Sequence, residues 1–301
     1  MSFLFESFEE WRRLCDQQQV PLYQPVLAYE MTQRERTEEE IWSGLAVAYQ
    51  VMKEAVQTGL SEEMQSYSGM ISNGAKNVYK HPVTVLSREF QTLISRALAA
   101  KEVNSCMGRV VAAPTAGASG ILPGTMVTLQ EIHELPDQKI HEGLLIGAGV
   151  ALILEKRASI AGAVGGCQAE TGSAAAMAAA AIVYCLGGSV VQALNAVAIT
   201  IQCMLGLVCD PVAGLVEVPC VVRNASAAAI ANSSAQIALA NVDSVIPVDE
   251  CVEAMAEIGQ SMEVKYKETA LGGLAATPTG QAISKKVLIQ DIEMLDEEVP
   301  E

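Results

Sequence analysis

The segment between Arg157 and Asp210 constrains the fold more than any other part of the chain, because Glu170 is its only charged residue. Alanine and glycine dominate this segment, and aromatic residues make up only 4% of the whole sequence. The distance between packed helices depends on the side chains at their contact, so a core of such small residues lets helix backbones approach closely. The segment therefore predicts a dense set of buried helices.

A membrane-spanning region is the competing interpretation of the same segment. Spanning helices are long and strongly apolar, with Trp, Tyr, Lys or Arg at the two interfaces. Here small residues replace Leu and Phe, no such flanks are present, and four uncharged polar side chains interrupt the run: Gln168, Gln192, Asn195 and Gln202. Buried helices are favoured, and no membrane association is expected.

Apolar residues recur at helical spacing along the rest of the chain, and no alternation of period two is long enough for a sheet. Thr37 and Glu40 form a capping box for a helix that Gly59 is expected to end. The sequence predicts an all-α fold and one domain over residues 1–301, with an acidic tail at about 291–301. Further helices are expected from near Pro82, with Leu86, Phe90, Leu93 and Ala97 on one face, and over residues 141–156, 170–186, 190–205, 216–242 and 249–262.

Two loops rich in hydroxyl groups interrupt the helical pattern. The first covers residues 66–76. The second runs through residues 104–124, where proline and glycine, including Pro123 and Gly124, are dense enough to exclude a helix. Both loops offer backbone N–H groups and side-chain hydroxyls for binding.

The charge balance excludes several classes of partner. The formal net charge is −16, and no basic patch of the kind that binds nucleic acid or acidic membranes is present. The chain opens without a basic region followed by an apolar one, so no secretory signal is predicted and a cytoplasmic location is expected. Its eight cysteines should therefore be thiols, metal ligands or core residues rather than disulfides.

Five of the cysteines carry little functional signal. Cys15, Cys185 and Cys251 lie within helical patterns and are interpreted as small core residues. Cys106 lies in the second loop and is ambiguous. Cys203 lies near the end of a predicted helix and could also be a core residue.

The other three cysteines, Cys167, Cys209 and Cys220, each lie beside or close to Gly or Pro, where a helix is broken. A thiolate at such a break can project from a helix end and accept hydrogen bonds from free N–H groups, as iron–sulfur ligands do. No Cys-x-x-Cys pair is present, which argues against zinc ribbons and ferredoxins. From the residues alone, three buried thiols are an equally good interpretation.

Three long stretches carry a resemblance to a known family: NSCMGRVVAAPTAGASGILPG (104–124), GGCQAETGSAAAMAAA (165–180) and GLVCDPVAGLVEVPCVVRN (206–224). The chain resembles the iron–sulfur-dependent bacterial L-serine dehydratases, specifically the separate α chain of their two-subunit form. The resemblance implies a 4Fe–4S cluster held by Cys167, Cys209 and Cys220. It also implies that one open iron binds the hydroxyl of L-serine, which is converted to pyruvate and ammonia.

Substrate contacts must be sought among the chain's own residues. A serine carboxylate needs N–H donors, hydroxyls or cations, and Lys76 or Arg109 could supply a cation. Glu170, the lone charge of its segment, is a candidate for supporting the cluster or handling protons, with a structural hydrogen-bonding role equally open. The substrate-binding candidates, for each of which an ordinary turn residue is the alternative, are Thr115, Ser119, Ser68, Ser72 and Asn73.

The general base stays unassigned. The three histidines, His81, His133 and His141, are each predicted to lie on the surface. The resemblance implies a smaller β chain that contributes to the active site, and no segment of this sequence resembles it. The β chain is therefore a possible source of the base, and a hetero-oligomer is expected.

Two other function classes compete with this interpretation. A pyridoxal-phosphate dehydratase would need a Schiff-base lysine and a phosphate loop in an α/β fold, and the missing strands argue against it. A non-enzymatic helical module that packs against a partner would contain no cluster, and it stays the main alternative.

Overall fold

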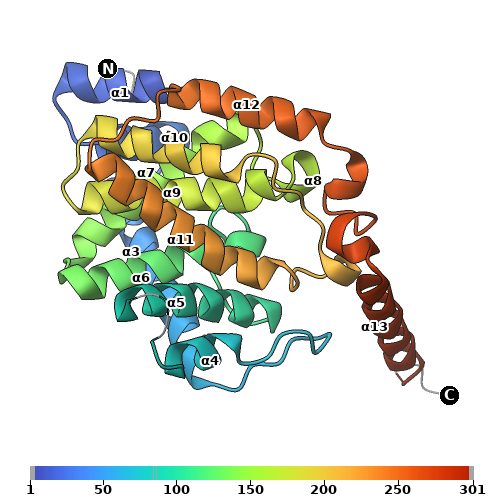
Figure 1. The fold of residues 1–301 in the computed structure, drawn as a ribbon. Helices are drawn as coiled ribbons and strands as arrows, with labels where there is room; N and C mark the ends of the chain where they lie inside the picture. The colour runs from blue at the N-terminus through green and yellow to red at the C-terminus, as the bar shows by residue number, and fades with distance from the viewer. Residues whose placement is uncertain (1–3, 84, 86, 298–301) are drawn as a thin grey trace.

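The computed structural model describes residues 4–83, 85 and 87–297, and it consists of helices packed on helices (Figure 1). Within these residues the only extended pairing is an isolated bridge between Cys209 and Lys267. The predicted all-α class is confirmed. The helices are α1 Phe8–Gln18, α2 Tyr23–Gln33, α3 Glu38–Ser61, α4 Gly74–Lys80, α5 Arg88–Ser105, α6 Ile121–His133, α7 Asp137–Arg157, α8 Gly162–Gly165, α9 Ser173–Cys185, α10 Val190–Met204, α11 Cys220–Leu239, α12 Val248–Ser261 and α13 Pro278–Glu297.

Helix α9 is the centre of the packing. It contacts α6, α7, α10 and α11, and all of its residues except Tyr184 are buried. Most of them are alanines, so four neighbouring helices can approach one thin helix from different sides. The Ala-rich segment thus folds as the sequence predicted, and it belongs to a hydrophobic cluster that extends along the sequence from Phe5 to Met255.

None of the helices in the described residues is long and apolar enough to cross a bilayer. The most apolar segment illustrates the reason. Helix α9 has 13 residues, whereas a spanning helix needs about 20.

Several helix ends differ from the sequence prediction. The capping box of Thr37 and Glu40 is confirmed, but α3 continues past Gly59 to Ser61. Helix α5 begins at Arg88 rather than near Pro82, because the Ser87 hydroxyl accepts a hydrogen bond from the N–H of Phe90 and caps the helix there. Leu86 lies outside the described residues. The predicted helix 216–242 is shorter, Cys220–Leu239. Helix α13 includes part of the expected acidic tail, of which residues 298–301 lie outside the described residues.

The prediction that Pro123 and Gly124 exclude a helix was wrong, since both lie in the first turn of α6. The N–H groups of a first turn have no intrahelical acceptor, so a proline there removes no hydrogen bond. Gly124 lets α6 lie directly on α5. A Cβ at this position would stand 2.5 Å from the backbone nitrogen of Ala97.

Helix α3 supplies a matched pair of glycines for a test of close packing. A Cβ on Gly59 would lie 2.3 Å from the carbonyl oxygen of Ala99 on α5, whereas a Cβ on Gly44 would meet nothing within 4 Å. Gly59→Ala should destabilise the fold by about 1–3 kcal/mol through overpacking. Gly44→Ala should stabilise it by up to about 1 kcal/mol through helix propensity. Urea unfolding of both variants checks this, and equal effects would contradict the close α3–α5 contact.

A buried carboxylate at the start of α4 predicts a pH-dependent stability. Glu102 accepts a hydrogen bond of 3.1 Å from the N–H of Ala75, and burial raises the pKa of its carboxyl group. The folded state therefore binds this proton more tightly than the unfolded state. The stabilisation is fully present below the unfolded pKa and is lost as the pH rises through the folded pKa.

Glu102→Gln should accordingly raise the melting temperature near pH 7–8 by about 2–4 °C. The difference should shrink as the pH approaches 4.5, where the wild-type carboxyl group is itself protonated in the folded state. Thermal unfolding across this range, with the exposed Glu257→Gln as control, measures the effect. A gain that stayed constant with pH would exclude titration of Glu102 as its cause.

Candidate functional site

Three cysteines from three separate segments converge at one end of the core. Cys167 lies between α8 and a π-helical turn, Gln168–Gly172, that leads into α9. Cys209 follows α10, and Cys220 is the first residue of α11. All three side chains are buried. The thiols of Cys167 and Cys209 hydrogen-bond to each other, and Cys220 lies within electrostatic reach of Cys167.

The environment of Cys167 favours its thiolate form. The Cys209 thiol donates a hydrogen bond to its sulfur, the Thr171 hydroxyl lies 2.9 Å away, and the guanidinium of Arg223 faces it. Together these lower the pKa of Cys167 against the opposing effect of burial. The hydrogen bond to Cys167 and burial raise the pKa of Cys209, and burial raises the pKa of Cys220 to about 12.

A segment from the far end of the sequence holds Cys209 in place. The N–H of Cys209 donates to the carbonyl of Tyr266 and the N–H of Glu268 donates to the carbonyl of Cys209, both at 2.8 Å. Glu268 adopts a left-handed backbone with φ of 62°, which is uncommon for a side chain of its size. Its carboxylate lies beside the Cys209 thiol, since a Cβ on Gly162 would lie 3.1 Å from the Cys209 sulfur and 3.3 Å from Glu268 Oε2.

Glu170 is the second carboxylate of the site. Its side chain is buried and accepts a very short hydrogen bond from the Thr115 hydroxyl. A Cβ on Gly117 would overlap this carboxylate at 2.4 Å, so the 115–120 loop fits closely over it. Burial raises the pKa of Glu170, and the nearby Glu268 adds to this effect. The lone charge of the central segment therefore lies beside the cysteines.

One face of α11 connects these parts. Cys220, Arg223 and Asn224 are spaced i, i+3 and i+4, which places them on the same side of the helix. The buried Asn224 accepts from the N–H of Gly120 and donates to the carbonyls of Gly117 and Cys220, all within 2.8–2.9 Å. The 115–120 loop is thereby fixed to the start of α11.

Lys101 of α5 is a cation that the sequence analysis missed. Its side chain is fully buried and donates to Val216 O at 2.8 Å, tying α5 to the loop before Cys220. Burial lowers the pKa of Lys101 to about 8, while the nearby Cys220 and Glu170 oppose this shift. The sequence feature that could have identified it is a lysine directly after the apolar run Ala97–Ala100, which points to a buried cation.

The structure brings some predicted residues into this site and gives others different partners. Thr115 lies in the site, where its hydroxyl donates a hydrogen bond to Glu170. Ser119 is fully buried, and its hydroxyl has no hydrogen-bond partner within the described residues. The Ser68 hydroxyl donates to the buried Glu217 at 2.5 Å, three residues before Cys220, and Ser66 binds the same carboxylate. Ser72 is exposed.

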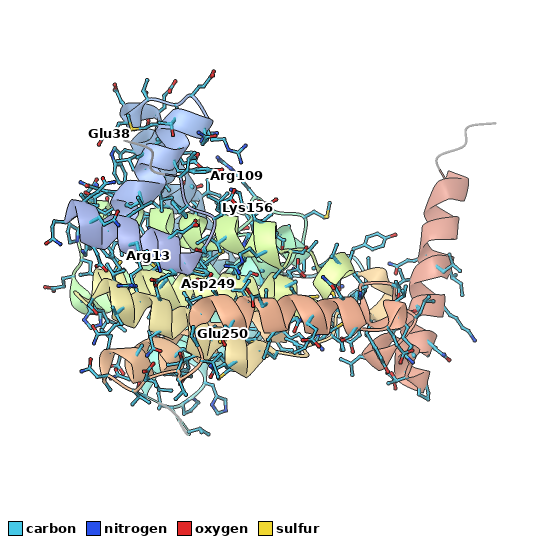
Figure 2. All side chains as sticks on the ribbon, turned by 90° about the horizontal axis from the view of Figure 1, so that it is seen from above. Arg13, Glu38, Arg109, Lys156, Asp249 and Glu250 are labelled. Carbon is cyan, nitrogen blue, oxygen red and sulfur yellow. The ribbon has the colours of Figure 1, made fainter. Side chains whose placement is uncertain are left out.

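Lys76 and Asn73 both contact Glu63. Lys76 forms an ion pair of 2.8 Å with it, and the Asn73 amide donates to it at 2.6 Å, which stabilises the beginning of α4. Arg109 is exposed on the outside of the molecule (Figure 2). Cys203 is not a core residue, because its side chain is exposed near the end of α10, whereas Cys15, Cys185 and Cys251 are buried as predicted.

The donor chemistry of the site fits an iron–sulfur cluster better than a single metal ion. Among the described residues, no three His, Cys, Asp or Glu side chains are grouped closely enough to hold one ion. A cluster places each protein ligand on a different iron, so its cysteines need only line a common space. The three buried sulfurs and the hydroxyl of Thr171 suit such a group, because hydrogen bonds to sulfur tune its potential.

Arg223, Asn224, Lys101 and Glu268 were not singled out from the sequence. Arg223 and Asn224 lie three and four residues after Cys220, and this helical spacing was the sequence signal that points to them. Glu268 lies 59 residues beyond Cys209 in a short non-helical segment, where no local pattern marks it.

Comparison with known proteins identifies the family of this chain. Residues 17–275 match the family model described as serine dehydratase alpha chain. The chain is 44% identical to "L-serine dehydratase, alpha chain" of Peptoniphilus asaccharolyticus, over 91% of this chain and 95% of that one. It is 42% identical to "Probable L-serine dehydratase, alpha chain" of Bacillus subtilis, over 94% and 95%. It is also 37% identical to "L-serine dehydratase" of Streptomyces coelicolor, over 91% of this chain but 61% of that protein. The chain therefore belongs to the serine dehydratase alpha chain family.

Proposed function

We propose that this chain is the catalytic α chain of an L-serine dehydratase that binds a 4Fe–4S cluster through Cys167, Cys209 and Cys220. The observation that carries the proposal is the convergence of three buried thiols from distant segments beside two carboxylates and two cations. The thiols, Glu170 and Lys101 are buried. A helical interaction module would have no need to bury these ionisable groups, because burying a charge is costly.

The bound cluster would supply an open iron as a Lewis acid for the substrate hydroxyl. The chain's own residues then bind and orient L-serine. Thr115 and the backbone N–H groups of the 115–120 loop are proposed to contact its carboxylate, together with the unpartnered hydroxyl of Ser119. Asn224 keeps this loop in register with Cys220.

Glu170 is proposed to handle a proton at its carboxylate during loss of the substrate hydroxyl. It lies under the 115–120 loop, and its carboxylate and the Cys209 sulfur both lie within 3.4 Å of the same point, the place of a Cβ on Gly162. In the overall reaction L-serine loses its α proton and its hydroxyl as water. The resulting aminoacrylate tautomerises and is hydrolysed to pyruvate and ammonia.

A second chain is proposed to complete the enzyme. Two of the relatives are named as alpha chains, which implies a partner, and the Streptomyces relative is a single chain of which this one covers only 61%. We propose that the rest of that longer chain corresponds to a separate β chain. We propose that this second chain supplies the base that removes the α proton, and that the α and β chains form a hetero-oligomer.

Anaerobic purification with and without the β chain tests the proposal. Iron content, the visible spectrum and pyruvate formation from L-serine are measured on each sample. We expect about four irons per chain, in keeping with a 4Fe–4S cluster, and activity that needs the partner. An iron-free chain after anaerobic reconstitution would reject the cluster and favour the helical interaction module.

A further inference from the structure

Arg223 makes contacts that set it apart from the other cations near the site. It lies one helical turn after Cys220 on the same face of α11. Its Nη1 donates to the carbonyl of Val208 at 2.8 Å, and its Nη2 forms an ion pair of 2.8 Å with Asp210. Both partners are the immediate neighbours of Cys209. The same guanidinium also interacts with the sulfur of Cys167.

One side chain thus touches all three cysteine-bearing segments. Its own helix carries Cys220, it binds the backbone before Cys209 and the side chain after it, and it faces Cys167. Its side chain is 17% exposed, and that of Asp210 only 4%, so solvent screens this ion pair much less than one on the surface.

Asp210 connects this ion pair to the segment just before α13. Its Oδ2 accepts a hydrogen bond of 2.8 Å from the N–H of Leu274. Gly273 has φ of 59°, and a Cβ there would lie 2.3 Å from Asp210 Oδ2, so this turn requires glycine. The loop that carries Cys209 is therefore held by Arg223 on one side and by residues 266–274 on the other.

We propose that Arg223 is a positioning residue that keeps the three cysteine-bearing segments in register for binding the cluster. The inference rests on the proposed function, since it assigns these cysteines as ligands. The planar guanidinium is needed for its geometry, because a lysine ammonium at the same place cannot reach Val208, Asp210 and Cys167 together. Its positive charge also favours the thiolate forms of Cys167 and Cys220.

Two substitutions separate geometry from charge. Arg223→Lys keeps the positive charge but loses the multiple contacts, and Arg223→Gln loses both. Arg12→Gln is the control, since Arg12 pairs with Glu9 and Asp16 on α1. Circular dichroism first establishes that each variant keeps its helix content.

The first readout needs no iron. The Cys209 amide donates to Tyr266 O and the Glu268 amide donates to Cys209 O, so both are protected from exchange with solvent. Hydrogen exchange at these two amides therefore reports whether the Cys209 loop stays in place. In the iron-free chain we expect exchange at these amides to rise by about tenfold or more in Arg223→Gln and Arg223→Lys, and to be unchanged in Arg12→Gln.

The second readout is the rate at which a chelator removes iron from the anaerobically reconstituted chain. It should rise by about tenfold in both Arg223 variants, since hydrogen bonding around the ligands stabilises a bound metal group. Wild-type exchange in both Arg223 variants, or wild-type iron release, overturns the inference. If the wild-type chain itself takes up no iron, the proposed function fails instead, and the exchange result still reports on the loop.

Discussion

Replacing Cys209 with alanine is expected to reduce iron binding by the anaerobically reconstituted chain to background and to abolish pyruvate formation. Cys209 hydrogen-bonds to Cys167, which in turn lies within electrostatic reach of Cys220. A cluster held by three protein thiolates would lose one of them, and the two that remain, Cys167 and Cys220, are not expected to hold it. Cys167→Ala and Cys220→Ala are expected to give the same result.

Cys185→Ala is the matched control for this test. Cys185 is buried like the three proposed ligands, but it lies at the far end of α9, where its thiol donates to the carbonyl of Lys139. Its loss should cost some stability and leave about four irons per chain, the content of a 4Fe–4S cluster. Full iron content in Cys209→Ala, or iron loss in Cys185→Ala, would refute the ligand assignment.

Iron and activity must be measured on the same samples. A variant that keeps its iron and loses activity has a defect in chemistry or partner binding, whereas a variant that loses both has lost the proposed site. This distinction separates the cysteines from the carboxylates and hydroxyls around them.

The central helices could be predicted from the sequence because their signal is local. A segment with a single charge and mostly Ala and Gly favours closely packed helices. Helix α9 is packed in this way, with four neighbouring helices around it. The capping box at Thr37 is equally local, since both partners lie within one turn. The ends of helices were predicted less accurately than their centres. The Ser87 cap and the position of Pro123 in α6 both depend on which backbone N–H groups lack an intrahelical acceptor, and periodicity does not show this.

The convergence of the cysteines depends on tertiary contacts that local sequence patterns do not encode. The neighbouring Gly and Pro residues place Cys167, Cys209 and Cys220 at breaks between helices, but they give no distance between the three thiols. The bridge between Cys209 and the segment around Lys267 joins residues far apart in the chain, so Glu268 reaches the site without any local signal. Lys101 and Arg223 lie on helices whose positions are set by their neighbours.

Several polar candidates show why residue type alone is a weak guide. Ser68 and Asn73 lie in a loop that looks suited to substrate, yet their side chains hold Glu217 and Glu63. A buried carboxylate such as Glu217 needs donors, and nearby hydroxyls supply them. Glu170 was the better clue, because a lone charge in an apolar segment must be paired, solvated or functional.

Glu170→Gln is the second prediction with a large effect. The substitution keeps the size of the side chain but removes its ability to take or give a proton. Because general acid–base catalysis typically contributes 10²–10⁴-fold, kcat should fall by about a hundredfold or more. The iron content should remain that of the wild-type chain, since Glu170 is not a proposed ligand.

Glu102→Gln is the matched control, because it makes the same chemical change at a buried carboxylate that serves α4 rather than the cysteine site. It should retain wild-type kcat. Thr115→Val tests the same site independently, because it removes the hydroxyl that donates to Glu170. Without that donor the buried carboxylate is less able to carry its charge, so the pKa of Glu170 should rise further. Because Glu170 must be protonated to give a proton to the departing hydroxyl, the alkaline limb of the kcat profile should then shift to higher pH. An unshifted profile in Thr115→Val, together with wild-type kcat in Glu170→Gln, would assign Glu170 to structural hydrogen bonding alone.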